Sequence, residues 1–253
     1  AEELSALEAR YPPGSMSRRI RMDGELLPGI SGSLVYGAFA HETHVAPGLL
    51  FDERYPILWT WDFNVSPMCS LICQRHHGRL FVIRELWMEE GSIPEMCDLF
   101  RAAIPASYPV RIYGDATGKA RTAQTRATSY QIIANELVSR GYNVKMHVPE
   151  SNPSVVDRIN TVNAAFASPE GESKVMIDAS CKELIADMES VIYDSNNGIR
   201  KITSSSDPYH WRSHLSDALG YCISREMPIQ FWKALGTVAI SIRQARYGAR
   251  AQQ

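Results

Sequence analysis

An alternation of residue types at positions 57–65, ILWTWDFNV, constrains the fold of this chain more than any other feature. Large apolar residues stand at every second position, and this period of two predicts a β-strand. Residues 70–75 and 79–87 are two further apolar stretches, and His76-His77-Gly78 between them predicts a hairpin turn. The best-patterned part of the chain therefore begins with three consecutive strands.

Helices and strands alternate after these three strands. Ser92-Ile93-Pro94-Glu95 is a capping box with a proline in the first turn, and it predicts a helix to about residue 103. Apolar periodicity and breaker residues then predict strands at 110–114, 144–148 and 174–178, and helices at 129–140, 152–167, 181–193 and 211–226. This order predicts an α/β fold in which helices flank a mixed β-sheet.

The chain divides into three regions by composition. Residues 1–50 contain Pro12-Pro13-Gly14, a basic cluster and several glycines, which predict an extended lead-in or linker with short strands, one of them around 33–39. Residues 51–230 carry the helix and strand patterns and are expected to form the folded domain. Residues 231–253 are expected to be a C-terminal tail.

Overall composition narrows the class of protein. Hydrophobic residues make up 45% of the 253 residues and charged residues 21%, as in ordinary globular proteins, and the net charge of -2 means that nucleic-acid binding would need a local basic patch. Five scattered cysteines without a CxxC pair favour reduced thiols over disulfides or structural zinc. Because no signal peptide or run of ~18 apolar residues is present, we expect a soluble intracellular protein.

The stretch VRIYGDATGKA at 110–120 resembles a phosphate-binding loop but departs from it in three ways. Only three residues separate Gly114 from Gly118, and Ala120 stands where a magnesium-binding hydroxyl is needed. Asp115 would also place negative charge where a phosphate needs backbone N–H groups. A kinase or ATPase is therefore the least favoured class, and a metal-binding acid at the end of a strand is favoured instead.

Three aspartates are candidate ligands for a metal. Asp62 belongs to the first long strand, Asp115 follows a later strand, and Asp217 lies at the edge of the apolar stripe of the last helix. Converging carboxylates repel one another, so a divalent cation such as magnesium or manganese is their natural partner. Two ions ~4 Å apart can support phosphodiester cleavage. Each aspartate could equally be a turn or cap residue.

Two other residues are weaker candidates for the same site. Glu85 lies in a strand and could supplement the metal ligands, although an ion pair with an arginine is at least as plausible. His214 precedes Asp217 by three residues on one helix face and could orient its carboxylate, move a proton or contact DNA, or have no role. The stretch His41-Glu42-Thr43-His44 does not match the zinc-binding HExxH motif, so no zinc site is assigned to it.

Basic residues near these acids are candidate contacts for phosphate groups. Lys119, Arg121 and Arg126 follow Asp115, and Arg158 is expected on the exposed face of the next helix. Such contacts would make binding strongly dependent on salt. A solvated basic surface without a ligand is the alternative.

Several stretches resemble the nuclease domain of the large terminase subunit of tailed bacteriophages. They are WDFNVSP, IYGDATGKAR, HLSDALGYCI, EARYPPG, VVDRINTVNAAFAS and CKELIADME. The resemblance covers the chain from about Leu4 to Tyr221. The resemblance implies a ribonuclease H-like fold and an endonuclease that cleaves concatemeric viral duplex DNA during packaging, leaving 5′-phosphate ends. It implies Asp62, Asp115 and Asp217 as ligands of two Mg²⁺ or Mn²⁺ ions.

The same resemblance implies partners and a location. Double-stranded DNA is the substrate, a portal protein and a small terminase subunit are partners, and the host cell cytoplasm is the compartment, with no membrane involved. Members of that family carry an N-terminal packaging ATPase domain, which this chain, without a Walker A match, is expected to lack. The alternative is a non-catalytic module that grips DNA or docks on the portal.

Overall fold

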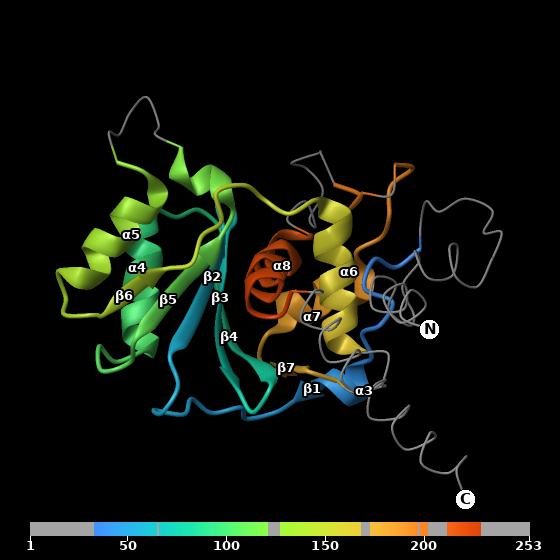
Figure 1. Ribbon diagram of the computed structural model, residues 1–253, viewed down its shortest axis with the longest axis horizontal. Coiled ribbons are helices and arrows are strands. Elements are labelled where there is room, and N and C mark those ends of the chain that lie inside the picture. Colours follow the sequence, from blue (N-terminus) through green and yellow to red (C-terminus); the bar gives the residue numbers. More distant parts are fainter. Residues whose placement is uncertain are drawn as a thin grey trace, which may run out of the picture.

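The computed structural model describes residues 33–64, 66–120, 127–167, 173–196, 198–201 and 212–228. Within them, seven strands form one sheet in the order β1-β7-β4-β3-β2-β5-β6, and helices cover both faces (Figure 1). The strands are β1 (Val45–Ala46), β2 (Ile57–Asp62), β3 (Met68–His76), β4 (Arg79–Met88), β5 (Val110–Gly114), β6 (Val144–Met146) and β7 (Val175–Asp178). The helices are α3 (His41–His44), α4 (Ile93–Ala103), η1 (Ala116–Lys119), α5 (Ser129–Val138), α6 (Val155–Phe166), α7 (Lys182–Ser190) and α8 (His214–Glu226). The predicted α/β fold with a mixed sheet is confirmed.

The sheet combines an antiparallel centre with parallel neighbours. β2, β3 and β4 pair antiparallel, while β5 is parallel to β2, β6 is parallel to β5, and β7 is parallel to both β4 and β1. All six residues of β2 are buried, because the strand lies inside the sheet and helices pack on both of its faces. Polar residues of this strand therefore have to find partners within the protein.

Two helical layers enclose two apolar cores. On one face α4 and α5 pack against Trp59, Trp61 and Ile112. On the opposite face α6, α7 and α8 pack against residues such as Leu58 and Tyr113. Successive strand residues point to opposite faces, so even-numbered residues of β2 and odd-numbered residues of β5 face the layer that contains α8.

Two local predictions are confirmed in detail. The Ser92 hydroxyl accepts a hydrogen bond from the Glu95 N–H, and the Glu95 carboxylate accepts one from the Ser92 N–H at 2.8 Å, which forms the capping box at the start of α4. His77 and Gly78 have φ values of 50° and 77°, as a tight hairpin turn between β3 and β4 requires.

Residues 33–39 differ from the expectation. The strand predicted around 33–39 is wrong, because this stretch forms a single β-bridge at Leu34 followed by a turn. Val35 and Tyr36 are buried in the same core as α6 and α8. The proposed tail, 231–253, lies outside the described residues. None of the described helices is both long and apolar enough to span a membrane.

Candidate functional site

Asp62 and Asp115 lie at the ends of two neighbouring strands. Trp61 of β2 pairs with Gly114 of β5 in parallel register, so the two aspartates leave the sheet side by side, where adjacent strands are about 4.8 Å apart. A Cβ on Gly114 would lie 2.7 Å from the Tyr130 hydroxyl and 2.8 Å from the Trp61 carbonyl oxygen. Glycine at this position therefore allows the close approach that aligns the two strand ends.

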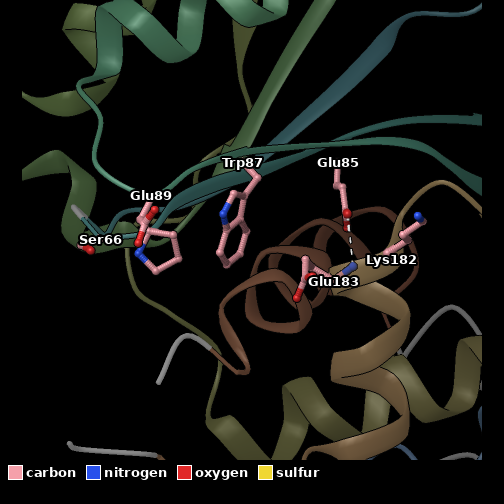
Figure 2. Close-up of a pocket in the computed structure, with 7 residues that line it drawn as sticks. Ser66, Glu85, Trp87, Glu89, Lys182 and Glu183 are labelled. Carbon is pink, nitrogen blue, oxygen red and sulfur yellow. Dashed lines mark hydrogen bonds between the residues drawn. The ribbon is translucent and has the colours of Figure 1, made fainter. Parts of the chain in front are cut away.

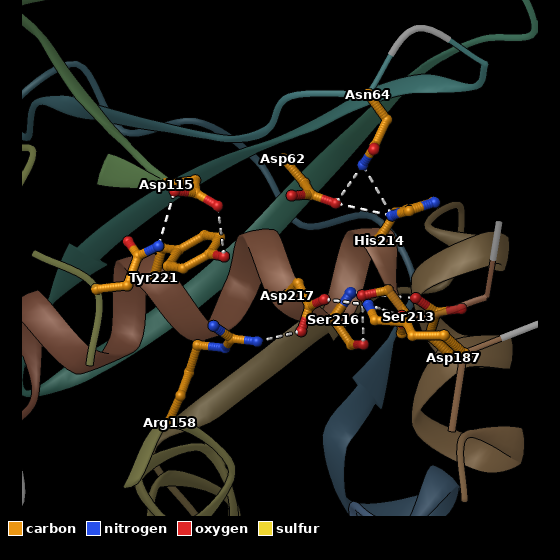
Figure 3. A network of polar contacts seen from close by, with 12 residues as sticks. Asp62, Asn64, Asp115, Arg158, Asp187, Ser213, His214, Ser216, Asp217 and Tyr221 are labelled. Atoms are coloured by element: carbon orange, nitrogen blue, oxygen red, sulfur yellow. Dashed lines mark hydrogen bonds and ion pairs between the residues drawn. The ribbon is translucent and has the colours of Figure 1, made fainter. Parts of the chain in front are cut away.

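Asp62 is held on the α8 side of the sheet. Only 8% of the residue is exposed. Its Oδ2 accepts a hydrogen bond from Asn64 Nδ2 at 2.6 Å and lies 2.8 Å from His214 Nδ1 (Figure 3). The other carboxylate oxygen, Oδ1, has no hydrogen bond from the described residues. His214 thus fixes the Asp62 carboxylate, whereas the sequence placed it beside Asp217.

Asp115 accepts hydrogen bonds through both of its carboxylate oxygens. Oδ1 accepts from the Thr117 N–H at 2.6 Å and from Asn152 Nδ2 at 2.7 Å, and Oδ2 accepts from the Tyr221 hydroxyl at 3.1 Å. Burial raises the pKa of Asp115, but the hydrogen bonds from Asn152 and Thr117 outweigh burial and hold the pKa below its ordinary value. The carboxylate is therefore ionised at neutral pH. It also caps η1, the 3₁₀ turn that contains Gly118 and Lys119.

Asp217 lies between two cations. Its Oδ1 is 2.6 Å from Arg158 Nη2, and its Oδ2 is 2.7 Å from Lys201 Nζ. His214, Asp217 and Tyr221 stand at positions i, i+3 and i+7 of α8 and share one stripe of the helix. One helix therefore contacts Asp62 through His214, contacts Asp115 through Tyr221, and carries the third predicted acid.

A match to a protein-family model decides which family this fold belongs to. Residues 59–226 match the Terminase RNaseH-like domain. The chain belongs to this family. The expected ribonuclease H-like fold is thereby confirmed.

Solved structures agree with the terminase RNase H-like assignment at the level of the fold. The large terminase of a thermophilic bacteriophage is similar with a TM-score of 0.59 and 15% identity, over 89% of this chain and 52% of that chain. The P22 large terminase nuclease domain is similar with a TM-score of 0.54 and 12% identity, over 76% of this chain and 91% of that chain. The chain thus spans about half the length of the thermophilic phage protein. No curated protein sequence matches the chain.

The site of this terminase domain fits a metal ion in part. Within the described ranges, no group of three or more His, Cys, Asp or Glu side chains is placed to hold a metal. Asp62 and Asp115 nevertheless supply ionisable oxygen ligands side by side, which suits a hard divalent cation. Asp217 differs because each of its oxygens is occupied by a cationic side chain.

Helix α8 is fixed to the sheet and to α6 by close contacts. The buried Thr60 hydroxyl of β2 donates a hydrogen bond to the Ala218 carbonyl at 2.6 Å. The absence of a side chain at Gly220 lets the Arg158 chain cross the helix, and the Arg158 guanidinium lies 4.7 Å from the centre of the Tyr221 ring. These contacts set the height and rotation of α8 over the strand ends.

A buried aspartate of α7 replaces the missing cap of α8. The N-cap residue Ser213 has a φ of 89° and makes no side-chain cap. Asp187 accepts a hydrogen bond from the Ser216 N–H at 3.1 Å and lies 3.5 Å from Arg212 (Figure 3). Burial raises the pKa of Asp187 to about 6, although hydrogen bonds from the Ser213 and Ser216 backbone lower it. Sequence reasoning missed this contact because it joins distant residues without a local motif.

Glu85 makes a structural contact, and the structure shows no ion pair between it and an arginine of the described residues. Its carboxylate accepts hydrogen bonds from the N–H groups of Glu183 at 3.1 Å and Leu184 at 3.0 Å, so it caps the start of α7 (Figure 2). Burial raises the pKa of Glu85, and these backbone hydrogen bonds partly offset that rise. A cavity of about 400 Å³ lies beside it, lined by Ser66, Pro67, Glu85, Trp87, Glu89, Lys182 and Glu183.

The predicted basic contacts separate into three cases. The expected exposure of Arg158 is wrong, because the residue is only 6% exposed and is paired with Asp217. Lys119 is exposed at the end of η1. Arg121 and Arg126 lie outside the described residues. Lys201, which no sequence pattern singled out, is instead the half-exposed cation that contacts the site.

Proposed function

We propose that this terminase RNase H-like domain is a divalent-metal-dependent endonuclease that cleaves concatemeric viral duplex DNA during genome packaging. The observation that carries the proposal is the pair of carboxylates, Asp62 and Asp115, at the ends of adjacent parallel strands. Membership of the terminase family supports the substrate class. Duplex DNA with little sequence preference fits a site formed by carboxylates rather than by residues that read bases.

The proposed cofactor is a pair of Mg²⁺ or Mn²⁺ ions. When bound, such ions activate a water molecule and stabilise the leaving oxygen of a phosphodiester. Asp62, Asp115 and Asp217 would hold these ions through their carboxylate oxygens. Asp115 stays ionised because its hydrogen bonds depress its pKa, and His214 holds the Asp62 carboxylate in one orientation through Nδ1. Tyr221 and Asn152 restrict the rotation of the Asp115 carboxylate.

The proposed path of the DNA backbone passes Lys119 at the end of η1. This lysine is exposed and lies four residues after Asp115, so its ammonium group can reach a phosphate close to the site. Arg121 and Arg126, which follow it in sequence, are proposed as further contacts. Binding through such charges should weaken steeply with added salt.

The proposed partners follow from the family. We infer that the domain works beside a packaging ATPase domain, a portal protein and a small terminase subunit in the cytoplasm of the host cell. This chain spans about half of the large terminase of the thermophilic phage, which leaves room for an ATPase portion in the remainder of such a protein.

Cleavage of supercoiled plasmid in Mg²⁺ or Mn²⁺ tests the proposed activity. Asp62→Ala and Asp115→Ala should each lower the rate by ~100-fold or more. Loss of a residue that only supports a metal ligand already costs about 10–100-fold, and these two aspartates are the proposed ligands themselves. Asp98→Ala is the matched control, because Asp98 is an exposed aspartate on α4, across the sheet from the site. It should keep the wild-type rate.

The alternative function has its own outcome in the same assay. If the wild type bound duplex DNA in a gel-shift experiment but left the plasmid intact in every divalent metal, the domain would be a non-catalytic module that grips DNA. Equal rates for Asp62→Ala and the wild type would show that another part of the protein, or a contaminant, cuts the DNA.

A further inference from the structure

The two cations that contact Asp217 differ in how firmly the fold holds them. The Arg158 side chain is 7% exposed, whereas the Lys201 side chain is 49% exposed. Each engages a different oxygen of the same carboxylate. The carboxylate itself is 7% exposed, so both contacts act where solvent screens poorly.

Arg158 is a fixed partner of Asp217. Its aliphatic chain lies against Gly220, where an added Cβ would be 2.6 Å from Arg158 Cγ, and its guanidinium lies over the Tyr221 ring. Removing this cation would leave a buried carboxylate without its main counter-charge, which is costly in a protein interior.

Lys201 is a releasable partner of the same carboxylate. Its ammonium contacts Asp217 Oδ2 at 2.7 Å and the Ser213 hydroxyl at 2.5 Å, while half of the side chain stays in solvent. A lysine ammonium is a compact, strongly hydrated charge on a flexible stem, so it can turn into water at small cost. The contact with this half-exposed ammonium should therefore cost less to break than the buried contact with Arg158.

We propose that Lys201 is a releasable counter-charge of Asp217 that competes with a divalent cation for this carboxylate. This inference rests on the proposed metal-dependent function. A divalent ion at Asp217 would stand next to two positive side chains, and repulsion from the ammonium would oppose it. Since Arg158 is fixed, Lys201 is the cation that leaves when a metal ion takes its position.

The proposal predicts a gain of metal binding when the lysine is removed. If the contact contributes about 1 kcal/mol, the upper value for exposed pairs, Lys201→Met should bind Mn²⁺ about fivefold more tightly than the wild type. A purely structural role for Lys201 would have the opposite sign, because Asp217 would lose its orientation and metal binding would weaken.

Isothermal titration of the folded protein with Mn²⁺ measures this effect without relying on cleavage. Lys201→Arg keeps the charge and should stay near the wild-type affinity. Lys119→Met removes an exposed lysine charge four residues after Asp115, and Lys119 makes no ion pair with Asp217, so this variant reports the general electrostatic effect. The gain from Lys201→Met should exceed that from Lys119→Met and should disappear in an Asp217→Asn background. Thermal melts check that each variant is folded.

The outcomes separate this inference from the proposed function. An affinity of Lys201→Met equal to or below that of the wild type, together with loss of binding in Asp62→Ala, would overturn the role of Lys201 and leave the metal site in place. A gain that persists in the Asp217→Asn background would also overturn it, because Lys201 would then act elsewhere. Failure of the wild type to bind Mn²⁺ at millimolar concentration would overturn both proposals.

Discussion

Replacing Gly220 with alanine should destabilise the domain, although alanine is the better helix former. An added Cβ would lie 2.6 Å from Arg158 Cγ and 2.7 Å from Arg158 Cδ, well inside normal contact distance. These atoms are in the middle of the side chain, and its far end is tied to Asp217 at 2.6 Å. The chain therefore has no free end that can swing away from the new methyl group.

The sign of the effect follows from two opposing magnitudes. Glycine to alanine in a helix interior contributes about 1 kcal/mol of stability. Forcing an extra methyl group into a packed site costs about 1–3 kcal/mol. Because Arg158 is held at both ends, we expect the larger part of that range and a net loss of about 1–2 kcal/mol in the free energy of unfolding.

Urea denaturation of the wild type and three variants tests this reasoning. The Gly220→Ala substitution is made in the wild type and in an Arg158→Ala background, where the clash is absent and alanine should stabilise by about 1 kcal/mol. Arg158→Ala itself should cost about 3–5 kcal/mol, because it leaves the buried Asp217 with only Lys201. Because such a loss could unfold the protein, all four proteins are measured in the same concentration of the osmolyte TMAO, which favours the folded state. A loss of equal size in both backgrounds would refute the proposed clash with Arg158.

Two further predictions concern the acids that cap helices. Glu85→Gln should lower the free energy of unfolding by about 1 kcal/mol. The amide oxygen can accept a hydrogen bond from one of the two N–H groups of α7, but the amide NH₂ would then face the other N–H group. Glu89→Gln, at an exposed position nearby in the sequence, is the control in chemical denaturation. For Asp187, burial raises the pKa to about 6, so the unfolded state ionises first and the contribution of Asp187 to stability is full below about pH 4 and is lost as the pH rises to about 6. The free energy of unfolding of the wild type minus that of Asp187→Asn, measured by chemical denaturation, should therefore fall by on the order of 3 kcal/mol from about pH 4 to about pH 6. A difference that stayed flat or rose over this range would contradict the raised pKa.

The fold could be predicted because its elements carry local signals. The strand predicted at 110–114 has those bounds in the structure, and the helix expected from the capping box at Ser92 ends at Ala103. The signals weaken where the stabilising contacts are long-range. A short strand is predicted around 33–39, but Val35 and Tyr36 are held by packing against distant helices, which no local pattern reports.

The ion pairs of Asp217 could not be predicted from the sequence for a related reason. Arg158 was expected to be exposed, yet every residue of α6 from Arg158 to Phe166 is buried, so this part of the helix has no solvent face for periodicity to mark. The pair joins residues 59 positions apart. Charge at a given position says nothing about burial unless the neighbouring elements are already placed.

The arrangement around α8 explains why the site must respond as a unit. His214, Asp217 and Tyr221 share one stripe of the helix, and the first and last of them contact the two aspartates at the strand ends. A rotation of α8 that moved His214 away from Asp62 would therefore also move Tyr221 relative to Asp115. The contacts that prevent such a rotation come from elsewhere in the domain, through the Thr60 hydroxyl of β2 and the Asp187 carboxylate of α7. The geometry at the strand ends thus depends on buried polar contacts that lie outside the three predicted aspartates.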